Sequence, residues 1–99
     1  MKKRELNSIK TALAHFKTAN ANGGCYCPSD AQTEALKNLY AETSGIIGKR
    51  ESIRLAQLLM SIDNANINEV YCVDASEEQI AAIEKAMAAV EVKGKGATA

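Results

Sequence analysis

The chain has 99 residues, which is close to the commonest size of one domain and too short for two independent cores. Its 12 basic and 12 acidic residues cancel, so no overall charge draws it onto nucleic acid or an anionic membrane. Because it contains 3 Tyr, 1 Phe and no Trp, its core must consist of aliphatic side chains and Ala, which favours closely packed helices. We therefore predict a single all-α domain.

The first predicted helix covers residues 3–20. Its apolar residues recur at three- and four-residue spacing, which places one stripe along the helix: Leu6, Ile9, Leu13 and Phe16. The Asn- and Gly-rich segment 20–24 then ends the helix, because Asn and Gly accept the left-handed backbone of a helix C-terminus.

The second predicted helix begins at Ser29, after an extended linker at residues 25–28. The linker is extended because the residue before Pro28 avoids the helical region. Ser29 and Gln32 match a capping box, in which each side chain accepts a hydrogen bond from the other residue's backbone N–H. The apolar face of this helix comprises Leu36, Leu39 and Tyr40.

The third predicted helix, at residues 50–62, is apolar on more than one side, which is typical of a central helix. Its apolar residues are Ile53, Leu55, Ala56, Leu58, Leu59, Met60 and Ile62. The turn-rich segment 63–68 is expected to end it. A second extended linker follows at 70–74, and the two linkers are candidates for a minimal β pair.

The fourth predicted helix follows Ser76, because Ser76 and Gln79 repeat the capping-box pattern. Helical spacing places four apolar residues on its buried side: Ile80, Ile83, Met87 and Val90. We expect the helical domain to span residues 1–92 and residues 93–99 to form a disordered tail. The predicted fold is a four-helix single domain.

A shift of 47 positions aligns residues 25–32 with 72–79, where Cys, Ser, an acid and Gln coincide. In the preceding helices the same shift places Lys3 on Arg50, Leu6 on Ile53 and Leu13 on Met60. A true duplication predicts two similar helical hairpins about an approximate two-fold axis, with Cys25 beside Cys72. The alternative is that Ser-x-x-Gln is a general helix start and that the other matches are coincidental.

Three cysteines are an odd number, and in a reducing cytosol we expect them to be thiols rather than a disulfide framework. Together with His15 they supply the four ligands that a closed zinc site requires: His15, Cys25, Cys27 and Cys72. Their spacing argues against such a site, because Cys-Tyr-Cys separates its thiols by one residue and zinc knuckles separate theirs by at least two. We therefore predict no metal and no cofactor, with zinc at this cluster as the alternative.

No catalytic constellation is present in the sequence, and we predict that the protein is not an enzyme. His15 faces away from the apolar stripe of its helix, so it is predicted to be a surface side chain rather than a base for a cysteine nucleophile. The phosphate-loop pattern over residues 43–50 fails at Thr43 and Arg50. The segment 63–74 has the length of a calcium loop, but Ala65, Ile67 and Asn68 occupy positions that require oxygen ligands or Gly.

A basic edge is predicted on the first helix, where Lys3, Lys10 and Lys17 lie seven residues apart, about 10 Å between neighbours. Residues 1–24 carry a net charge of +4 and residues 55–92 a net charge of −6. This polarity has two interpretations. Either the first helix contacts phosphates or an acidic partner, or it packs against the acidic second half or another copy of the chain.

The candidate binding residues are Lys3, Lys10, Lys17, Tyr26, Lys49 and Arg50. Tyr26 is included because its Gly and Pro neighbours favour an exposed anchor. The function we predict is a non-enzymatic, protein-interaction module that binds a protein partner or forms a homo-oligomer. Short helical chains of this character are similar to phage and mobile-element accessory proteins that inhibit a host defence or nucleic-acid-processing complex. The alternative is a small nucleic-acid or nucleotide-binding protein that uses the basic edge and the Gly48-Lys49-Arg50 helix start.

A cytoplasmic location without membrane insertion is the remaining prediction. The N-terminus begins like the charged region of a signal peptide, but polar residues interrupt the apolar run that must follow: Asn7, Ser8, Lys10 and Thr11. No window approaches the roughly 20 apolar residues that span a bilayer.

Overall fold

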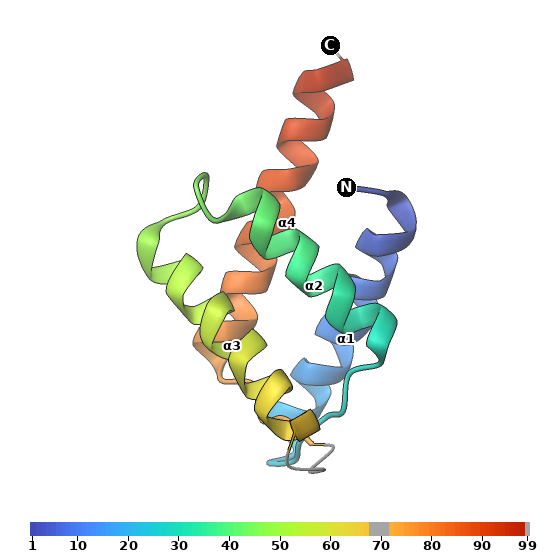
Figure 1. Ribbon diagram of the computed structural model, residues 1–99, viewed down its shortest axis with the longest axis vertical. Helices are drawn as coiled ribbons and strands as arrows, with labels where there is room; N and C mark the ends of the chain where they lie inside the picture. Colours follow the sequence, from blue (N-terminus) through green and yellow to red (C-terminus); the bar gives the residue numbers. More distant parts are fainter. Residues whose placement is uncertain (68–71, 99) are drawn as a thin grey trace.

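The computed structural model describes the backbone of residues 1–67 and 72–98 and the side chains of 1–67 and 72–91. Within that part the chain forms four helices: α1 (Lys3–Ala21), α2 (Asp30–Thr43), α3 (Lys49–Ile67) and α4 (Glu77–Thr98). Figure 1 shows α4 passing behind α2, with α1 and α3 on opposite sides. The predicted all-α, four-helix fold is confirmed.

Two helices extend beyond their predicted ends. The predicted end of α3 at residue 62 is wrong, because the helix continues through Asp63-Asn64-Ala65-Asn66 to Ile67. Asp and Asn are only weak helix breakers, and this segment contains no Gly or Pro that would stop the helix. α4 ends at Thr98, beyond residue 92, where we expected the helical domain to end. The division into a domain over 1–92 and a tail over 93–99 stays a prediction.

Both predicted capping boxes are present. At the start of α2, Ser29 Oγ accepts from Gln32 N at 3.1 Å and Gln32 Oε1 accepts from Ser29 N at 2.8 Å. At the start of α4, the corresponding Ser76 and Gln79 distances are 3.1 and 3.0 Å. Each box satisfies two backbone donors that the first turn of a helix leaves free.

One continuous core is built by all four helices and the second linker. Its largest fully buried side chains are Phe16, Ile9, Leu36, Leu39, Leu55, Leu58, Ile62 and Ile83. α2 and α4 each contact the other three helices, whereas α1 and α3 do not contact each other. The prediction that the third helix is central was therefore wrong: α2 and α4 are the central pair. The second apolar side of α3 faces solvent instead.

The buried positions of the two hairpins correspond. In α1, Ile9, Ala12 and Phe16 are buried, and the positions 46 residues later are the buried residues Leu55, Leu58 and Ile62 of α3. The same shift aligns Lys3-Arg4-Glu5 with the identical Lys49-Arg50-Glu51. For these helices the correct shift is 46 and not 47, so the pairs Leu6–Ile53 and Leu13–Met60 were misaligned by one residue.

In the second helix of each hairpin the shift is 47. The buried residues of α2 at Thr33, Ala35, Leu36, Leu39 and Thr43 correspond to the buried Ile80, Ala82, Ile83, Ala86 and Val90 of α4. The one extra residue of the second hairpin therefore lies between Ile62 and Cys72.

Polar contacts between the hairpins repeat as well. Lys17 on α1 pairs with Glu84 on α4 at 3.0 Å, and the equivalent positions Asp63 on α3 and Lys37 on α2 pair at 3.3 Å with reversed charges. Similarly, Asn38 on α2 donates to Glu5 on α1, and the equivalent Lys85 on α4 pairs with Glu51 on α3. Two similar helical hairpins are thus related by an approximate two-fold axis, as the duplication predicts.

The two linkers meet at this axis. Tyr26 and Val73, which are equivalent positions, form one antiparallel bridge with N···O distances of 3.0 and 2.9 Å. This confirms the minimal β pair, although the predicted second linker begins in residues 68–71, which lie outside the described part of the chain. The Asn20 side chain also donates to Ala75 O at 2.9 Å, which fixes the end of α1 against the second linker.

Candidate interaction surface and linker crossing

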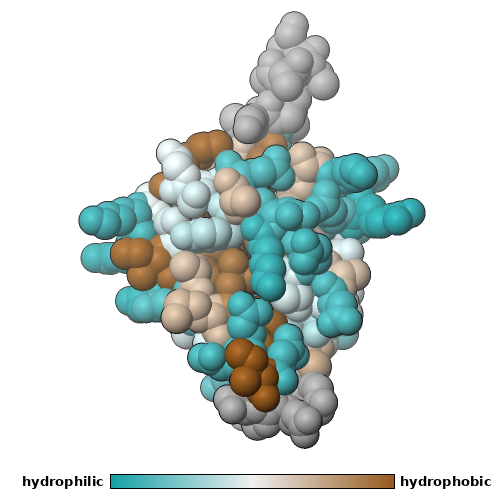
Figure 2. Space-filling model, viewed as in Figure 1, coloured by the Kyte–Doolittle hydropathy of each residue, from teal (hydrophilic) through white to brown (hydrophobic). Residues whose placement is uncertain are grey.

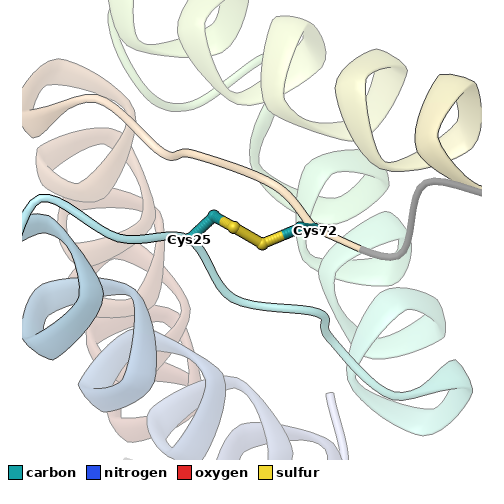
Figure 3. The surroundings of a disulfide bond; sticks show 2 residues. All are labelled: Cys25 and Cys72. Carbon is teal, nitrogen blue, oxygen red and sulfur yellow. A yellow bond between two sulfur atoms is a disulfide. The ribbon is translucent and has the colours of Figure 1, made fainter.

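The linker crossing carries a disulfide between Cys25 and Cys72 (Figure 3). Their Cα atoms are 5.5 Å apart, so the predicted proximity of these two residues is confirmed. The prediction that all three cysteines are thiols is wrong, because an odd count leaves one cysteine over but does not prevent the other two from pairing. The bond closes a loop with a sequence separation of 47 residues. By the chain-entropy estimate a loop of this size contributes about 4 kcal/mol of stability.

The zinc alternative does not fit this arrangement. Cys25 and Cys72 are bonded to each other, so neither supplies a thiolate ligand. Cys27 is free and exposed, with its Sγ 3.8 Å from Pro28 O. Among the residues that the structure describes, no three His, Cys, Asp or Glu side chains are grouped so that they could hold a metal ion.

Tyr26 is half-buried, contrary to the prediction of an exposed anchor. Its ring stacks on His15 with a centroid distance of 4.6 Å and meets Phe16 edge-on at 5.3 Å. Its hydroxyl donates to Gln32 Oε1 at 2.7 Å. Local Gly and Pro neighbours therefore did not decide its exposure; the packing of the linker on α1 did. His15 is exposed, as predicted.

The basic edge of α1 is divided rather than continuous. Lys17 pairs with Glu84 at 3.0 Å, and Lys10 lies 3.9 Å from Glu91, so both face acidic residues of α4. Lys3 lies apart from them, in a shallow depression that also involves Arg4 and Asn7. Of the two interpretations of the charge polarity, the structure favours packing of the first helix against the acidic second half. Such exposed pairs contribute about 0–1 kcal/mol each.

Lys49 and Arg50 are the first two residues of α3. With Ile53 and Arg54 they line a shallow depression on the surface. Arg54 pairs with Glu78 at 2.9 Å, but within the described residues neither Lys49 nor Arg50 forms an ion pair. The start of α3 therefore presents two cations that form no ion pair within the described residues beside an exposed isoleucine, although Arg50 also lies near Glu51 and Glu78.

A stripe of exposed apolar residues follows from this depression along α3. On α3, Ile53, Met60 and Ile67 lie seven residues apart, with exposed fractions of 47, 64 and 78%. Ile46, in the turn before the helix, is 56% exposed. Figure 2 shows hydrophobic side chains at the surface over α3, with hydrophilic ones around them. Seven residues are almost two helical turns, so Ile53, Met60 and Ile67 share one face. We call Ile53, Met60 and Ile67 the α3 stripe.

Sequence reasoning missed the α3 stripe because it counted every apolar residue of the third helix as buried. The seven-residue spacing was the available signal. Leu55, Leu58, Leu59 and Ile62 form one apolar face, and Ile53, Met60 and Ile67 form another on the opposite side of the helix. A helix with two such faces can bury only one of them within a single chain.

Glu5 and Glu51 occupy equivalent positions in the first turns of α1 and α3, and the pKa of each is lowered. For Glu5 the main cause is the hydrogen bond from the Asn38 side chain, followed by one from the Lys2 backbone. For Glu51 the main cause is a hydrogen bond that its carboxylate accepts from its own backbone N–H, with Lys85 adding to it. A carboxylate near a helix N-terminus also meets the positive end of the helix dipole.

Comparison with protein-family models, with curated proteins and with solved structures gave no match. In the described part of the chain, no helix combines the length and the apolar character that crossing a membrane requires.

Proposed function

We propose that the protein is a non-enzymatic protein-interaction module and that its partner binds over the α3 stripe. The observation that carries this proposal is that three large apolar side chains, Ile53, Met60 and Ile67, are exposed along one face of α3. Apolar side chains exposed to water are unfavourable, and where several lie on one face they mark interaction sites on soluble domains. The three residues lie along one side of α3, so a single partner can contact all of them.

The alternative, a nucleic-acid or nucleotide-binding protein, has less support. Lys10 and Lys17 are paired with acidic residues of α4, which leaves the basic edge of α1 without free cations at two of its three positions. Tyr26 is half-buried and stacks on His15, so one face of its ring is already covered and less of it is free for base stacking. The Gly48-Lys49-Arg50 helix start still offers positive charge, but aliphatic residues follow it.

The finer role that we propose is inhibition of a host defence or nucleic-acid-processing complex by a phage or mobile-element accessory protein. A small rigid domain with one apolar face serves this role by covering a surface that the complex needs. The cytoplasmic location stays a prediction. The disulfide weighs against it, because disulfides persist mainly in oxidising compartments.

A photo-reactive amino acid in place of Met60 tests whether α3 meets a partner in the native host. Ala14 is the matched control position, because it is the exposed residue of α1 that corresponds to Met60. We expect a covalent adduct from position 60 and none from position 14. The adduct mass distinguishes another protein from a second copy of the chain, and equal or absent adducts at both positions contradict the proposal.

A further inference from the structure

We infer that the segment bound by the α3 stripe is an acidic amphipathic helix of another protein, with its carboxylates over the start of α3. This inference rests on the proposed function and specifies its partner. The carrying observation is that Ile53, which lies in the stripe, shares its surface depression with three cations: Lys49, Arg50 and Arg54.

The charges at this end of α3 are unequal. Glu51 pairs with Lys85 at 3.4 Å and Glu78 pairs with Arg54 at 2.9 Å, so both nearby carboxylates are already engaged. Lys49 and Arg50 have no ion pair within the described residues. A partner that covers Ile53 removes water from these two cations as well. Burial without a compensating charge is costly, and a basic partner is repelled, so carboxylates are the complementary groups.

The stripe lies along one face of a single helix, which favours an elongated partner such as a helix. From Ile53 to Ile67 the face extends about 21 Å along α3, from the rise of an α-helix. A partner helix with apolar residues seven positions apart has the same rise between them, so one of its side chains can contact each of Ile53, Met60 and Ile67. Its acidic residues then belong at one end, because the far half of α3 carries no free cation among its described residues.

A second copy of this chain is a poorer match. In a parallel pair of α3 helices, Lys49 and Arg50 would face the same two cations of the other copy. In an antiparallel pair they would face the end of α3, where Asp63 is the acidic residue among those described, and Asp63 is already paired with Lys37 at 3.3 Å. Neither arrangement brings free carboxylates to the basic start of α3.

A displayed library of helical peptides tests the inference. The peptides are roughly 20 residues long, carry apolar residues at three positions seven apart, and are randomised elsewhere. After selection on the intact protein, we expect Asp and Glu to be enriched at one end of the peptides. We also expect the Lys49→Glu/Arg50→Glu variant to bind these peptides at least tenfold more weakly.

The matched control is Lys3→Glu/Arg4→Glu, which makes the same change in the identical tripeptide of α1 and should leave binding unchanged. Circular dichroism of each variant checks that the helices are retained.

Two peptide results would contradict the inference. If neutral or basic peptides bind as tightly as acidic ones and the Met60→Asp variant does not bind them, the acidic character of the partner is refuted and the α3 stripe is still the binding surface. Peptides that are indifferent to Met60→Asp overturn the proposed function too. A wild-type dimer that Met60→Asp converts to a monomer shows that a second copy occupies the face and overturns the inference.

Discussion

α1 and α3 are equivalent helices with different outer faces. Both begin with Lys-Arg-Glu, and both bury apolar residues at matching positions against the central pair of helices. On the outside, Ile53, Met60 and Ile67 of α3 replace Asn7, Ala14 and Ala21 of α1. Since α1 occupies its place without an apolar outer face, the fold does not require one on α3. The difference therefore marks the surface that serves something other than folding.

The charges of the two helices differ in the same sense. On α1, Lys10 and Lys17 lie close to acidic residues of α4, so they are used within the molecule. On α3, Lys49 and Arg50 have no such partners among the described residues and lie beside the exposed Ile53. Two cations of α1 are therefore paired within the molecule, whereas two cations of α3 have no ion pair in the described residues and face solvent beside Ile53.

The largest expected effects test the shared core. Phe16→Ala should lower the free energy of unfolding by about 3–5 kcal/mol and Ile62→Ala by about 2–5 kcal/mol, because each leaves a cavity at the same place in its hairpin. Urea denaturation measures both. Met60→Ala is the control, with a change within about 0.5 kcal/mol because the residue is exposed. A core variant that unfolds like the control would break the correspondence between the hairpins.

Removal of the disulfide tests whether the two linkers hold the hairpins together. We expect Cys25→Ser/Cys72→Ser to lose about 2–4 kcal/mol of stability, because the unfolded chain regains the entropy of the closed loop. Thermal unfolding with and without a reductant measures the change. Cys27→Ser should leave the transition unchanged and still sensitive to reductant. A wild-type transition that ignores reductant would contradict the bond.

The two capping boxes sharpen the comparison at a smaller scale. Ser29→Ala and Ser76→Ala should each lower stability by about 1 kcal/mol. We expect the larger loss at Ser29, because Gln32 is buried and also accepts from the Tyr26 hydroxyl, whereas Gln79 is not buried. Chemical denaturation of the two variants under one set of conditions compares them. A larger loss at Ser76 would show that the Tyr26 contact adds nothing to the first box.

The smallest effect is the titration of the two equivalent glutamates. The pKa of Glu5 and that of Glu51 both lie below the ordinary 4.5, so folding favours their ionised forms. Their contribution to stability is complete above pH 4.5 and is lost as the pH falls through the lowered values. Carboxyl chemical shifts measured by NMR give both pKa values. Asn38→Ala should raise the pKa of Glu5 and leave that of Glu51 unchanged; a shift in both would refute the assigned cause.

Most of the fold could be predicted because its signals are local. The capping boxes, the end of α1 and the buried face of α4 all follow from spacing within a few residues. The repeat was found from Cys, Ser and Gln, but one extra residue between Ile62 and Cys72 moved the alignment of the first helices out of register. That error paired Leu13 with the exposed Met60 and hid the identical Lys-Arg-Glu starts.

The candidate site was harder to predict because exposure is a tertiary property. Spacing separates Met60 and Leu59 onto two apolar faces of α3, but only the packing of the helix shows that Met60 is exposed and Leu59 is buried against the core. Likewise, Tyr26 is half-buried because it packs on His15 and Phe16 from another element. The spacing of Lys10 and Lys17 predicts the basic edge, but only the position of α4 shows that these two residues pair with acidic residues of the same chain.

The central claim is tested most directly by one comparison of affinities. The partner identified by cross-linking is titrated against three proteins: wild type, Met60→Asp and Ala14→Asp. The two variants place the same charge at equivalent exposed positions of the two hairpins. With binding over the α3 stripe, calorimetry should show at least a tenfold loss for Met60→Asp, about 1.4 kcal/mol, and an unchanged affinity for Ala14→Asp. Equal affinities for all three proteins, or a loss confined to Ala14→Asp, would contradict the account.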